Sequence, residues 1–475
     1  MCSFLFARTT SAISDLTLAS ANEYARHRGP DGTDVRRLTD SHGFQITLLH
    51  NLLDISGNTC SQPISAEGRD DVFALFNGEI YNFRDFGNFR SDTECIVPAF
   101  VKHRRQTSAM LDGEFSTVVY DGGMNSLTIL TDPFLTKPLY LGRWDNDTDF
   151  AAATCASSLK GIGCTSIEMA TPNAVCQIQF TSKELIIETH RNVVEFSLDQ
   201  HKKNYDDWDT AFLAAVRKRA LHGAHRPMVF LSSGYDSGAI CLALNLQKIE
   251  YDSLSILAGE EQRLLDQRIR INRAGACGKA MKIRGLSESD VRQMSSDIKT
   301  NVEPFVYVHE DQPGVISNLQ SDGGALGANY LAKLARKQNR LVNLSGSGAD
   351  EIMSDYGFAG EKFYYHSEFG GRFPDELQSI FPWKKFYGDT QRSYLFKDEY
   401  ILGRHGIEGR YPFLDKQVVQ EFLSLAPPLK NDVYKGAIEH FLASHDYPFE
   451  RLKKRGFSPR ADDSVLRRFF SRLLN

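Results

Sequence analysis

The residues from Met228 to Ile240 combine a short apolar run with a turn that could bind an anion. The apolar residues 228–231 are followed by Ser-Ser-Gly-Tyr-Asp-Ser at 232–237, and a helical pattern of apolar residues then resumes. A strand, a tight turn and a helix present free backbone N–H groups to an anion at the N-terminus of the helix. Phosphate is the expected anion, although the chain contains no GxxxxGK[ST] loop.

A second loop of small residues, Ser-Gly-Ser-Gly-Ala-Asp-Glu at 345–351, follows the apolar run 341–344. The first loop resembles the SGGxDS pyrophosphate loop of enzymes that adenylate a substrate with ATP, and the second resembles the SGEGxDE segment that accompanies it. This resemblance implies an ATP site, with Mg²⁺ on the oxygen ligands Asp236 and Asp350. The residues expected to bind ATP are Leu231, Ser232, Ser233, Gly234, Asp236, Ser237, Ser345, Gly346, Asp350 and Glu351.

Two serines depart from these loop patterns. Ser233 stands where the first loop usually has a glycine, and a serine does not adopt positive φ angles as cheaply as glycine. We therefore predict that Ser233 has a negative φ and offers its hydroxyl to the phosphates. Ser347 replaces the glutamate of the second loop, a residue that borders the acceptor site, and this leaves the identity of the acceptor open.

Cys2 directly follows the initiator methionine. A small residue at this position allows Met1 to be removed, which leaves Cys2 with a free α-amino group whose pKa is near ~8. That group can act as the base for the Cys2 thiol, so that one residue supplies both nucleophile and base. The alternative is a coincidental cysteine near the terminus, which a lone cysteine by itself favours.

Three polar segments change that balance: Arg28-Gly29-Pro30-Asp31-Gly32, Asn77 to Asn82, and Ser91 to Glu94. Taken singly, they are two turns and a helix N-cap with acidic residues in the first turn. Together with Cys2, they resemble in order and spacing the glutaminase domain of the asparagine synthetase family. That domain is of the N-terminal-nucleophile type, and its motifs are an N-terminal cysteine, RGPD, NGEIYN and SDTE.

The resemblance implies a role for each matching residue. An amide nitrogen of Asn77 and the backbone N–H of Gly78 match the oxyanion hole that amide hydrolysis requires. Glu79 and Asp92 match the carboxylates that hold the α-ammonium group of glutamine, and Arg28 matches the arginine that supports the site.

One departure affects the same site, because Leu52 stands where the family has an arginine that pairs with the glutamine α-carboxylate. Either another basic side chain binds that carboxylate or glutamine use is weakened. The retained cysteine, asparagine, glycine and aspartate favour glutaminase activity.

Two further segments extend the resemblance towards the C-terminus. Residues 405–415, His-Gly-Ile-Glu-Gly-Arg-Tyr-Pro-Phe-Leu-Asp, resemble the family's HGLEVRVPFLD. The basic run 451–458 resembles RxKxGF, in which a lysine contacts pyrophosphate in the transition state. Lys454 falls at that position, so it is the expected catalytic lysine, and Lys435 is a second conventional lysine of this region.

The composition indicates an ordinary globular protein. The chain has 475 residues with a net charge of −5, so no excess of basic residues points to nucleic acid. Its apolar runs are too short to span a membrane, and no basic segment precedes the N-terminal apolar run as in a signal peptide. The eight cysteines form no CxxC pair, which argues against a zinc site or a disulfide framework and favours the cytoplasm.

The elements that must position these residues fall into two halves. Residues 2–195 are β-rich, with expected strands at 44–49, 72–76, 116–120, 127–130, 174–180 and 185–189 and helices at 19–26 and 93–102. A polar linker, 197–207, leads to a helix at 208–220 and then to strands at 228–231, 253–257, 280–283 and 341–344 that alternate with helices. This alternation predicts a parallel α/β sheet, with ligands at the carboxyl ends of its strands.

The resemblance implies the finer fold classes and the domain boundaries. We expect an α+β domain at 2–195, an N-terminal-nucleophile-hydrolase-like αββα sandwich with glutaminase activity. We expect an ATP-pyrophosphatase (adenine-nucleotide α-hydrolase-like) α/β domain at 205–475 that forms the amide.

The expected activity is that of a glutamine-hydrolysing, ATP-dependent amidotransferase with ATP and Mg²⁺ as cofactors. It adenylates a carboxylate, converts it to an amide with ammonia from glutamine, and releases AMP and pyrophosphate. Aspartate is the family's default acceptor. The alternatives are a specialised amidotransferase on another carboxylate, such as a sugar uronic acid or a natural-product precursor, and an ATP-only relative without glutaminase activity. A homodimer is the expected assembly, with no nucleic-acid or membrane partner.

Overall fold

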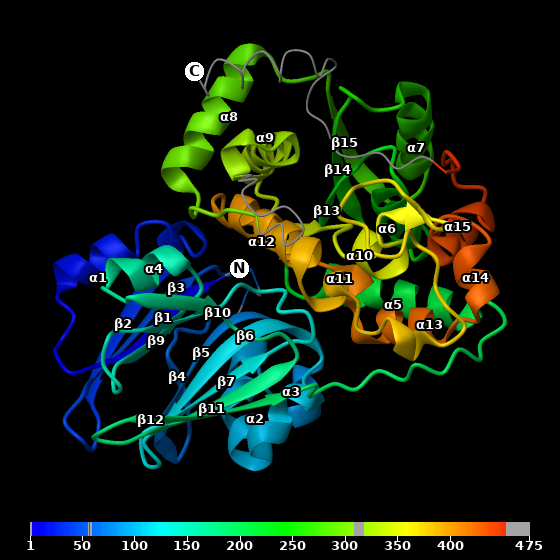
Figure 1. Ribbon diagram of the computed structural model, residues 1–475. Coiled ribbons are helices and arrows are strands. Elements are labelled where there is room, and N and C mark those ends of the chain that lie inside the picture. Colours follow the sequence, from blue (N-terminus) through cyan, green and yellow to red (C-terminus); the bar gives the residue numbers. More distant parts are fainter. Residues whose placement is uncertain (1, 56, 58, 308–317, 453–475) are drawn as a thin grey trace. The chain divides into compact units, whose positions relative to one another are not determined.

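The computed structural model describes residues 2–55, 57, 59–307 and 318–452, and the chain forms two compact units (Figure 1). Unit 1 comprises residues 1–195 together with 222–224 and 403–407. Unit 2 comprises residues 196–221, 225–402 and 408–475. None of the described helices combines the length and the apolar character that a membrane span needs.

Unit 1 contains two antiparallel sheets of six strands each, in the orders β10-β8-β9-β1-β3-β2 and β12-β11-β7-β6-β5-β4. Its strands are β1 (Ser3–Thr9), β2 (Gly32–Thr39), β3 (Gln45–Leu52), β4 (Ile64–Ala66), β5 (Arg69–Ile80), β6 (Gly113–Asp121), β7 (Ser126–Thr131), β8 (Tyr140–Arg143), β9 (Phe150–Ala153), β10 (Ser166–Met169), β11 (Ala174–Phe180) and β12 (Leu185–Arg191). Its α-helices are α1 (Asp15–Ala21), α2 (Ile96–His103), α3 (Thr107–Met110) and α4 (Ala156–Gly161).

The two sheets of unit 1 pack face to face and are covered by helices on their outer sides. Across the interface, the ring of Phe6 lies 5.8 Å from that of Tyr120 and 6.3 Å from that of Phe180, measured between centroids. Helices α1 and α4 contact each other, and α4 lies on β8 and β9, whereas α2 lies on β4 and β5 and α3 on β7. The result is a layered arrangement of helices, sheet, sheet and helices around an apolar core.

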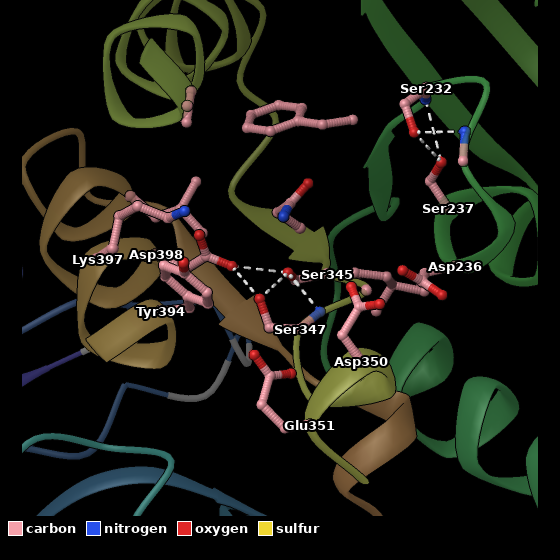
Figure 2. A pocket seen from close by; sticks show the side chains of 18 of the residues that line it. Ser232, Asp236, Ser237, Ser345, Ser347, Asp350, Glu351, Tyr394, Lys397 and Asp398 are labelled. Atoms are coloured by element: carbon pink, nitrogen blue, oxygen red, sulfur yellow. Dashed lines mark hydrogen bonds between the residues drawn. The ribbon is translucent and has the colours of Figure 1, made fainter. Parts of the chain in front are cut away.

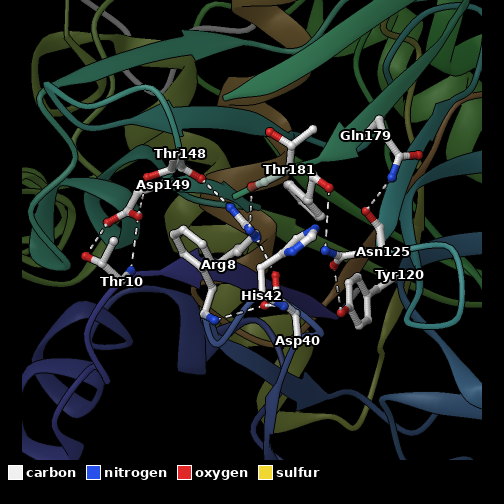
Figure 3. Close-up of polar contacts among 12 residues, drawn as sticks. Arg8, Thr10, Asp40, His42, Tyr120, Asn125, Thr148, Asp149, Gln179 and Thr181 are labelled. Carbon is white, nitrogen blue, oxygen red and sulfur yellow. Dashed lines mark hydrogen bonds and ion pairs between the residues drawn. The ribbon is translucent and has the colours of Figure 1, made fainter. Parts of the chain in front are cut away.

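A buried arginine on β1, the strand that begins just after Cys2, forms hydrogen bonds to other segments of unit 1. Arg8 Nε donates to Asp40 Oδ2 at 2.8 Å, and its other nitrogens donate to the carbonyl oxygens of Thr148 at 2.7 Å and Thr181 at 3.0 Å (Figure 3). Its guanidinium carbon also lies 3.6 Å from the centroid of the Phe44 ring. A buried charge is tolerated when it is paired and hydrogen-bonded in this way, so Arg8 joins β1 to three other segments.

Unit 2 is built on a parallel sheet of five strands in the order β15-β14-β13-β16-β19. These strands are β13 (Met228–Phe230), β14 (Tyr251–Ile256), β15 (Cys277–Ile283), β16 (Val342–Leu344) and β19 (Glu408–Arg410), and a small hairpin is formed by β17 (Gly357–Phe358) and β18 (Glu361–Lys362). Its α-helices are α5 (Asp206–Leu221), α6 (Tyr235–Leu246), α7 (Gln262–Ala274), α8 (Glu288–Asn301), α9 (Gly323–Lys337), α10 (Ala349–Met353), α11 (Lys384–Tyr387), α12 (Asp389–Gly403), α13 (Lys416–Ser424), α14 (Pro427–Asn431) and α15 (Gly436–Ala443).

The topology of this sheet brings the two small-residue loops together. β13 pairs directly with β16 in parallel, so the loops after their carboxyl ends, 231–234 and 345–348, lie at the same edge of the sheet. The predicted parallel α/β sheet is confirmed, and the loops lie where ligands bind such sheets.

The structure differs from the local expectations at three places. Residues 77–80 were expected to form a turn but continue strand β5, because each of them pairs with a residue of β6. The helix expected at 19–26 is replaced by α1 and a 3-10 turn, Ala25–His27. Ser91, by contrast, is the N-cap of a helix with acidic residues in its first turn, as predicted, although this is the 3-10 helix Asp92–Cys95 and the serine side chain makes no capping hydrogen bond. Strand β19 was not predicted, since its charged residues Glu408 and Arg410 are buried as an ion pair of 2.6 Å.

Candidate functional site

The first loop is closed by its own hydroxyl groups. Ser237 Oγ accepts a hydrogen bond from the backbone N–H of Ser232 at 3.0 Å and lies 2.9 Å from the Ser232 hydroxyl (Figure 2). The N–H of Gly234 donates to Ser232 Oγ at 3.1 Å, and Gly234 is the N-cap of α6. Small residues are needed here because the chain turns within a few residues from β13 into α6, and the helix N-terminus then faces the pocket with its partial positive charge.

A buried arginine holds the outer side of this loop. Arg268, on α7, donates from Nη1 to the carbonyl oxygens of Ser232 at 2.9 Å and Gly234 at 2.6 Å. Its Nε donates to the carbonyl oxygen of Pro448 at 2.8 Å. A Cβ on Gly238 would lie 2.7 Å from the guanidinium carbon, so the helix needs a glycine at this point. By engaging two loop carbonyls, Arg268 fixes the orientation of the peptide groups of the first loop.

Ser233 has a negative φ, as predicted, since it is absent from the residues with positive φ. Its backbone N–H donates to Glu260 Oε2 at 2.6 Å, and its hydroxyl donates to the same oxygen. The hydroxyl therefore contacts a carboxylate of the neighbouring loop after β14. An anionic group of the protein thus occupies the N–H of Ser233, where a phosphate was expected.

The two carboxylates predicted to hold a metal ion lie on either side of one ammonium group. Lys435 Nζ is 2.6 Å from Asp236 Oδ1 and 2.8 Å from Asp350 Oδ1, and the Tyr434 hydroxyl donates to Asp350 Oδ1 at 3.1 Å. Burial alone would lower the pKa of Lys435, but the two carboxylates raise it above its usual range. Two convergent carboxylates are a suitable donor set for Mg²⁺, and Lys435 is the cation that the chain itself supplies to them.

The second loop directs its hydroxyl groups to α12. The hydroxyls of Ser345 and Ser347 donate to Asp398 Oδ2 at 2.8 and 2.7 Å, and the N–H of Ser347 donates to Ser345 Oγ at 3.3 Å (Figure 2). Gly348 caps α10 with a φ of 95°, a conformation in which a side chain would be strained. Glu351, on α10, is buried and accepts a hydrogen bond from the Tyr356 hydroxyl.

These loops line one cavity of about 360 Å³ in unit 2. Of the residues predicted to bind ATP, Leu231 and Ser233 do not line it, whereas Ser232, Gly234, Asp236, Ser237, Ser345, Gly346, Asp350 and Glu351 do. The cavity also contains side chains that sequence reasoning did not identify, Asp322, Tyr356, Tyr364, Tyr394, Lys397 and Asp398. They belong to no small-residue loop, so only their place along α12 and its neighbours brings them to the site. Lys454, the predicted catalytic lysine, lies outside the described residues.

In unit 1, the turn that contains Arg28 lies against the end of β3. A Cβ on Gly29 would be 2.2 Å from the carbonyl oxygen of Asn51 and 2.6 Å from the nitrogen of Leu52. Arg28 is buried and donates from Nε to the carbonyl oxygen of Cys2 at 3.2 Å, while the N–H of Leu53 lies 3.5 Å from the Cys2 thiol sulfur. The basic side chain of Arg28 therefore contacts Cys2, the residue that carries the predicted nucleophile.

Asn77 and Gly78 occupy β5 in a way that suits an oxyanion hole. Asn77 is fully buried, and neither Oδ1 nor Nδ2 has a hydrogen-bond partner within the described part of the chain. Gly78 has a φ of 140°, and a Cβ there would lie 2.0 Å from the carbonyl oxygen of Glu114 on β6. A buried amide without a partner costs free energy, and a bound substrate oxygen could accept a hydrogen bond from its Nδ2.

The predicted ammonium-binding carboxylates, Glu79 and Asp92, lie together in the same unit. Asp92 Oδ2 accepts a hydrogen bond from the N–H of Ile80 at 2.9 Å, and both carboxylates contact the His222 ring. His222 Nε2 is 2.5 Å from Glu79 Oε2 and 3.7 Å from Asp92 Oδ2. The two carboxylates thus converge on one nitrogen, which is the arrangement needed to hold an ammonium group.

Comparisons with known proteins agree with this arrangement. The family model described as a glutamine amidotransferase domain matches residues 1–198. A putative glutamine-hydrolysing asparagine synthetase 1 of Methanocaldococcus jannaschii is 24% identical over 425 residues, covering 83% of this chain and 72% of that protein. A probable asparagine synthetase of Schizosaccharomyces pombe is 27% identical over 449 residues, covering 85% of this chain and 72% of that protein.

A third relative shows how far the chain extends along such proteins. Asparagine synthetase 1 of Bacillus subtilis is 25% identical over 370 residues, covering 70% of this chain and 55% of that protein, so the chain spans about half the length of this relative. The matches to the relatives extend beyond the glutaminase region into unit 2. The amidotransferase match covers residues 1–198, and over most of its length the chain is similar to proteins named as glutamine-hydrolysing asparagine synthetases.

Proposed function

We propose that this chain is a glutamine-dependent amidotransferase that activates a carboxylate with ATP and converts it to an amide. The observation that carries the proposal is the convergence of Asp236 and Asp350, from loops at the ends of two adjacent parallel strands, on one cation. An internal cation between two such carboxylates marks a place where a metal-bound triphosphate can be held. The related proteins are named as glutamine-hydrolysing asparagine synthetases, which supports the same reaction.

The proposed glutaminase domain spans residues 2–195 and has the N-terminal-nucleophile-hydrolase type of sandwich. The Cys2 thiolate attacks the side-chain amide carbon of glutamine, with its own α-amino group as the base. The negative charge that develops on the amide oxygen is stabilised by Nδ2 of Asn77 and the N–H of Gly78. Glu79 and Asp92 bind the α-ammonium group, and Arg28 supports the site through its contact with the Cys2 carbonyl oxygen.

The proposed synthetase domain spans residues 205–475 and has the ATP-pyrophosphatase type of parallel sheet. The backbone N–H groups of the first loop and the N-terminus of α6 bind phosphate oxygens of ATP. Asp236 and Asp350 would hold Mg²⁺, which when bound would supply positive charge against the phosphate oxygens. The acceptor carboxylate attacks the α-phosphorus, pyrophosphate leaves, and ammonia then displaces AMP from the acyl-adenylate.

Aspartate is the proposed acceptor. Lys397 is the one basic side chain among the described residues that line the cavity, and it lies 4.0 Å from Asp322, so a cation and carboxylates are both available to an amino acid. The relatives named as asparagine synthetases support this choice.

The proposal is tested by measuring glutamate release from glutamine and pyrophosphate release from Mg-ATP with L-aspartate. Cys2→Ala is expected to abolish glutamate release and glutamine-dependent asparagine formation while ammonium chloride still supports asparagine formation. Cys60→Ala is the matched control, because Cys60 is the other partly exposed cysteine in the described part of the chain. Pyrophosphate release that does not respond to aspartate would refute the proposed acceptor, and equal synthesis from glutamine and ammonia in Cys2→Ala would refute the glutaminase assignment.

A further inference from the structure

Asp398 brings a carboxylate to the place where the second loop lacks one. The loop carries Ser347 in place of the family's glutamate, and the Ser347 hydroxyl donates to Asp398 Oδ2 at 2.7 Å. The Ser345 hydroxyl donates to the same oxygen at 2.8 Å (Figure 2). Asp398 comes from α12, about fifty residues further along the chain, so the substitution in the loop and the carboxylate on the helix form one hydrogen-bonded unit.

The other acidic side chains of the cavity already have ionic or structural partners. Lys435 pairs with both Asp236 and Asp350. Asp322 caps α9 through the N–H groups of Gly324 and Ala325 and accepts from the Tyr307 hydroxyl, and Glu351 accepts from the Tyr356 hydroxyl.

Asp398 differs from these groups because its hydrogen bonds come from two serine hydroxyls and both fall on Oδ2. Its Oδ1 accepts no hydrogen bond from the described residues. Asp398 also lines the cavity and is partly exposed in it. One carboxylate oxygen is therefore fixed by the second loop, while the other remains available to a substrate.

The charged and titratable groups around Asp398 come from four parts of unit 2. Lys397 and Glu399 are its neighbours on α12, Tyr307 interacts with it from the segment after α8, and Asp322 and Glu351 line the same cavity. Burial is the largest influence and raises the pKa of Asp398, whereas Lys397 and the two serine hydroxyls lower it. The net effect is a raised pKa, which brings a carboxyl group closer to the range in which it exchanges protons near neutral pH.

We propose that Asp398 is the general base of the amide-forming step, held by Ser345 and Ser347, the second of which stands at the loop position where the family has a glutamate. The inference rests on the proposed function. The lone pair of ammonia forms a C–N bond with the acyl carbon of the acyl-adenylate, and the bond from that carbon to the phosphate oxygen breaks, so that AMP leaves with the electron pair. The Asp398 carboxylate accepts the proton that the nitrogen loses.

The test separates adenylation from amide formation. Exchange of labelled pyrophosphate into ATP, with Mg²⁺ and L-aspartate, reports adenylation, and asparagine formation from saturating ammonium chloride reports the complete reaction. Asp398→Asn keeps the shape of the side chain and an oxygen that accepts from the two serines but cannot take the proton. We expect it to lower kcat for asparagine formation by roughly 100-fold, while pyrophosphate exchange and the KM for ATP stay within about threefold of the wild type.

A pH profile gives the second readout. The base acts as the carboxylate, so the wild-type rate should fall as the pH is lowered through the raised pKa of Asp398, and Asp398→Asn should lose this acidic limb. Ser347→Ala should retain the limb with a smaller loss of rate, since one of the two hydrogen bonds to Asp398 remains. Asp375→Asn, the same chemical change at an exposed site of unit 2, is the control and should leave both readouts unchanged.

The outcomes distinguish this inference from the proposed function. A wild-type enzyme without aspartate-dependent pyrophosphate exchange would overturn the proposed acceptor and the inference with it. Wild-type exchange together with an Asp398→Asn variant that loses exchange and asparagine formation equally would overturn the inference alone, because Asp398 would then act in binding or structure. An acidic limb that persists in the pH profile of Asp398→Asn would also overturn the inference and leave the proposed function standing.

Discussion

The two candidate sites are prepared for their ligands in opposite ways. In unit 1, Asn77 is buried with both polar atoms of its amide unpartnered within the described chain. In unit 2, the carboxylates of Asp236 and Asp350 are neutralised by Lys435. The difference follows from the cost of each alternative. A neutral amide without a partner costs about 1–3 kcal/mol, whereas two adjacent buried carboxylates without a cation would cost several times more.

In unit 1 a neutral amide is left for the substrate to complete, whereas in unit 2 the adjacent pair of carboxylates already holds a cation. The Asn77 amide can remain without a partner until a substrate oxygen binds, because the free-energy cost of burying it is small compared with the stability of a folded domain. The acidic pair needs a cation, and Lys435 provides one.

The largest expected effect is that of removing the internal cation. Lys435→Met leaves the Asp236 and Asp350 carboxylates facing each other, and we expect the free energy of unfolding to fall by about 3 kcal/mol, the lower end for a broken buried pair because Asp236 is partly exposed. Added Mg²⁺ should raise the Tm of the variant more than that of the wild type, since the ion can replace the lost charge. Thermal unfolding with and without Mg²⁺ measures both effects.

The exposed Lys362→Met serves as the control for this variant and should leave Tm nearly unchanged. An equal Mg²⁺-induced shift in the wild type and in Lys435→Met would show that the two carboxylates do not form the metal site.

The variant Asn77→Ala tests the amide of the candidate site in unit 1 that has no partner in the described part of the chain. Removing a donor of the oxyanion hole typically lowers kcat by about 10²–10³, and we expect this loss in glutamate release from glutamine. The free energy of unfolding should stay the same or rise slightly, because the variant removes a buried polar group that has no partner in the described structure. Glutaminase kinetics and urea unfolding, with the exposed Asn88→Ala as control, measure the two effects. A marked loss of stability without a loss of kcat would contradict the assignment.

The smallest expected effect concerns Glu260, the carboxylate at the N–H and hydroxyl of Ser233. Glu260→Gln removes a negative charge that competes with phosphate for the first loop, and we expect the KM for ATP to fall by about fivefold, roughly 1 kcal/mol. Glu261→Gln removes the same charge from the same loop without removing the contact to Ser233. If both variants change the KM equally, the effect is one of general charge and Glu260 does not occupy a phosphate position.

Much of the fold could be predicted from hydrophobic patterns. The strand expected at 174–180 has the same bounds as β11, and the strands of the parallel sheet at 228–231 and 341–344 match β13 and β16 to within one residue. These strands are apolar and lie in the core, so their pattern is strong. The pattern failed at β19, whose Glu408 and Arg410 read as exposed although they pair with each other in the interior.

In the candidate sites, only the residues that belong to a recognisable motif could be predicted from the sequence. The small-residue loops were recognisable because a turn from a strand into a helix requires residues of this kind. Asp398 and Lys397 carry no such signal, since their positions on α12 have no fixed spacing from either loop. Glu260 was likewise missed, although it contacts Ser233 directly.

The sequence by itself determined the chemical inventory of this protein: a nucleophile at position 2, two small-residue loops, two acidic residues for a cation, and the replacement of the loop glutamate by Ser347. The tertiary structure decided which groups meet. It joined Ser347 to Asp398, placed Lys435 between two carboxylates and left the Asn77 amide unpartnered among the described residues. The physical reason is that a motif records neighbours along the chain, whereas charge compensation and hydrogen bonding depend on distances of a few ångströms between segments that only folding brings together.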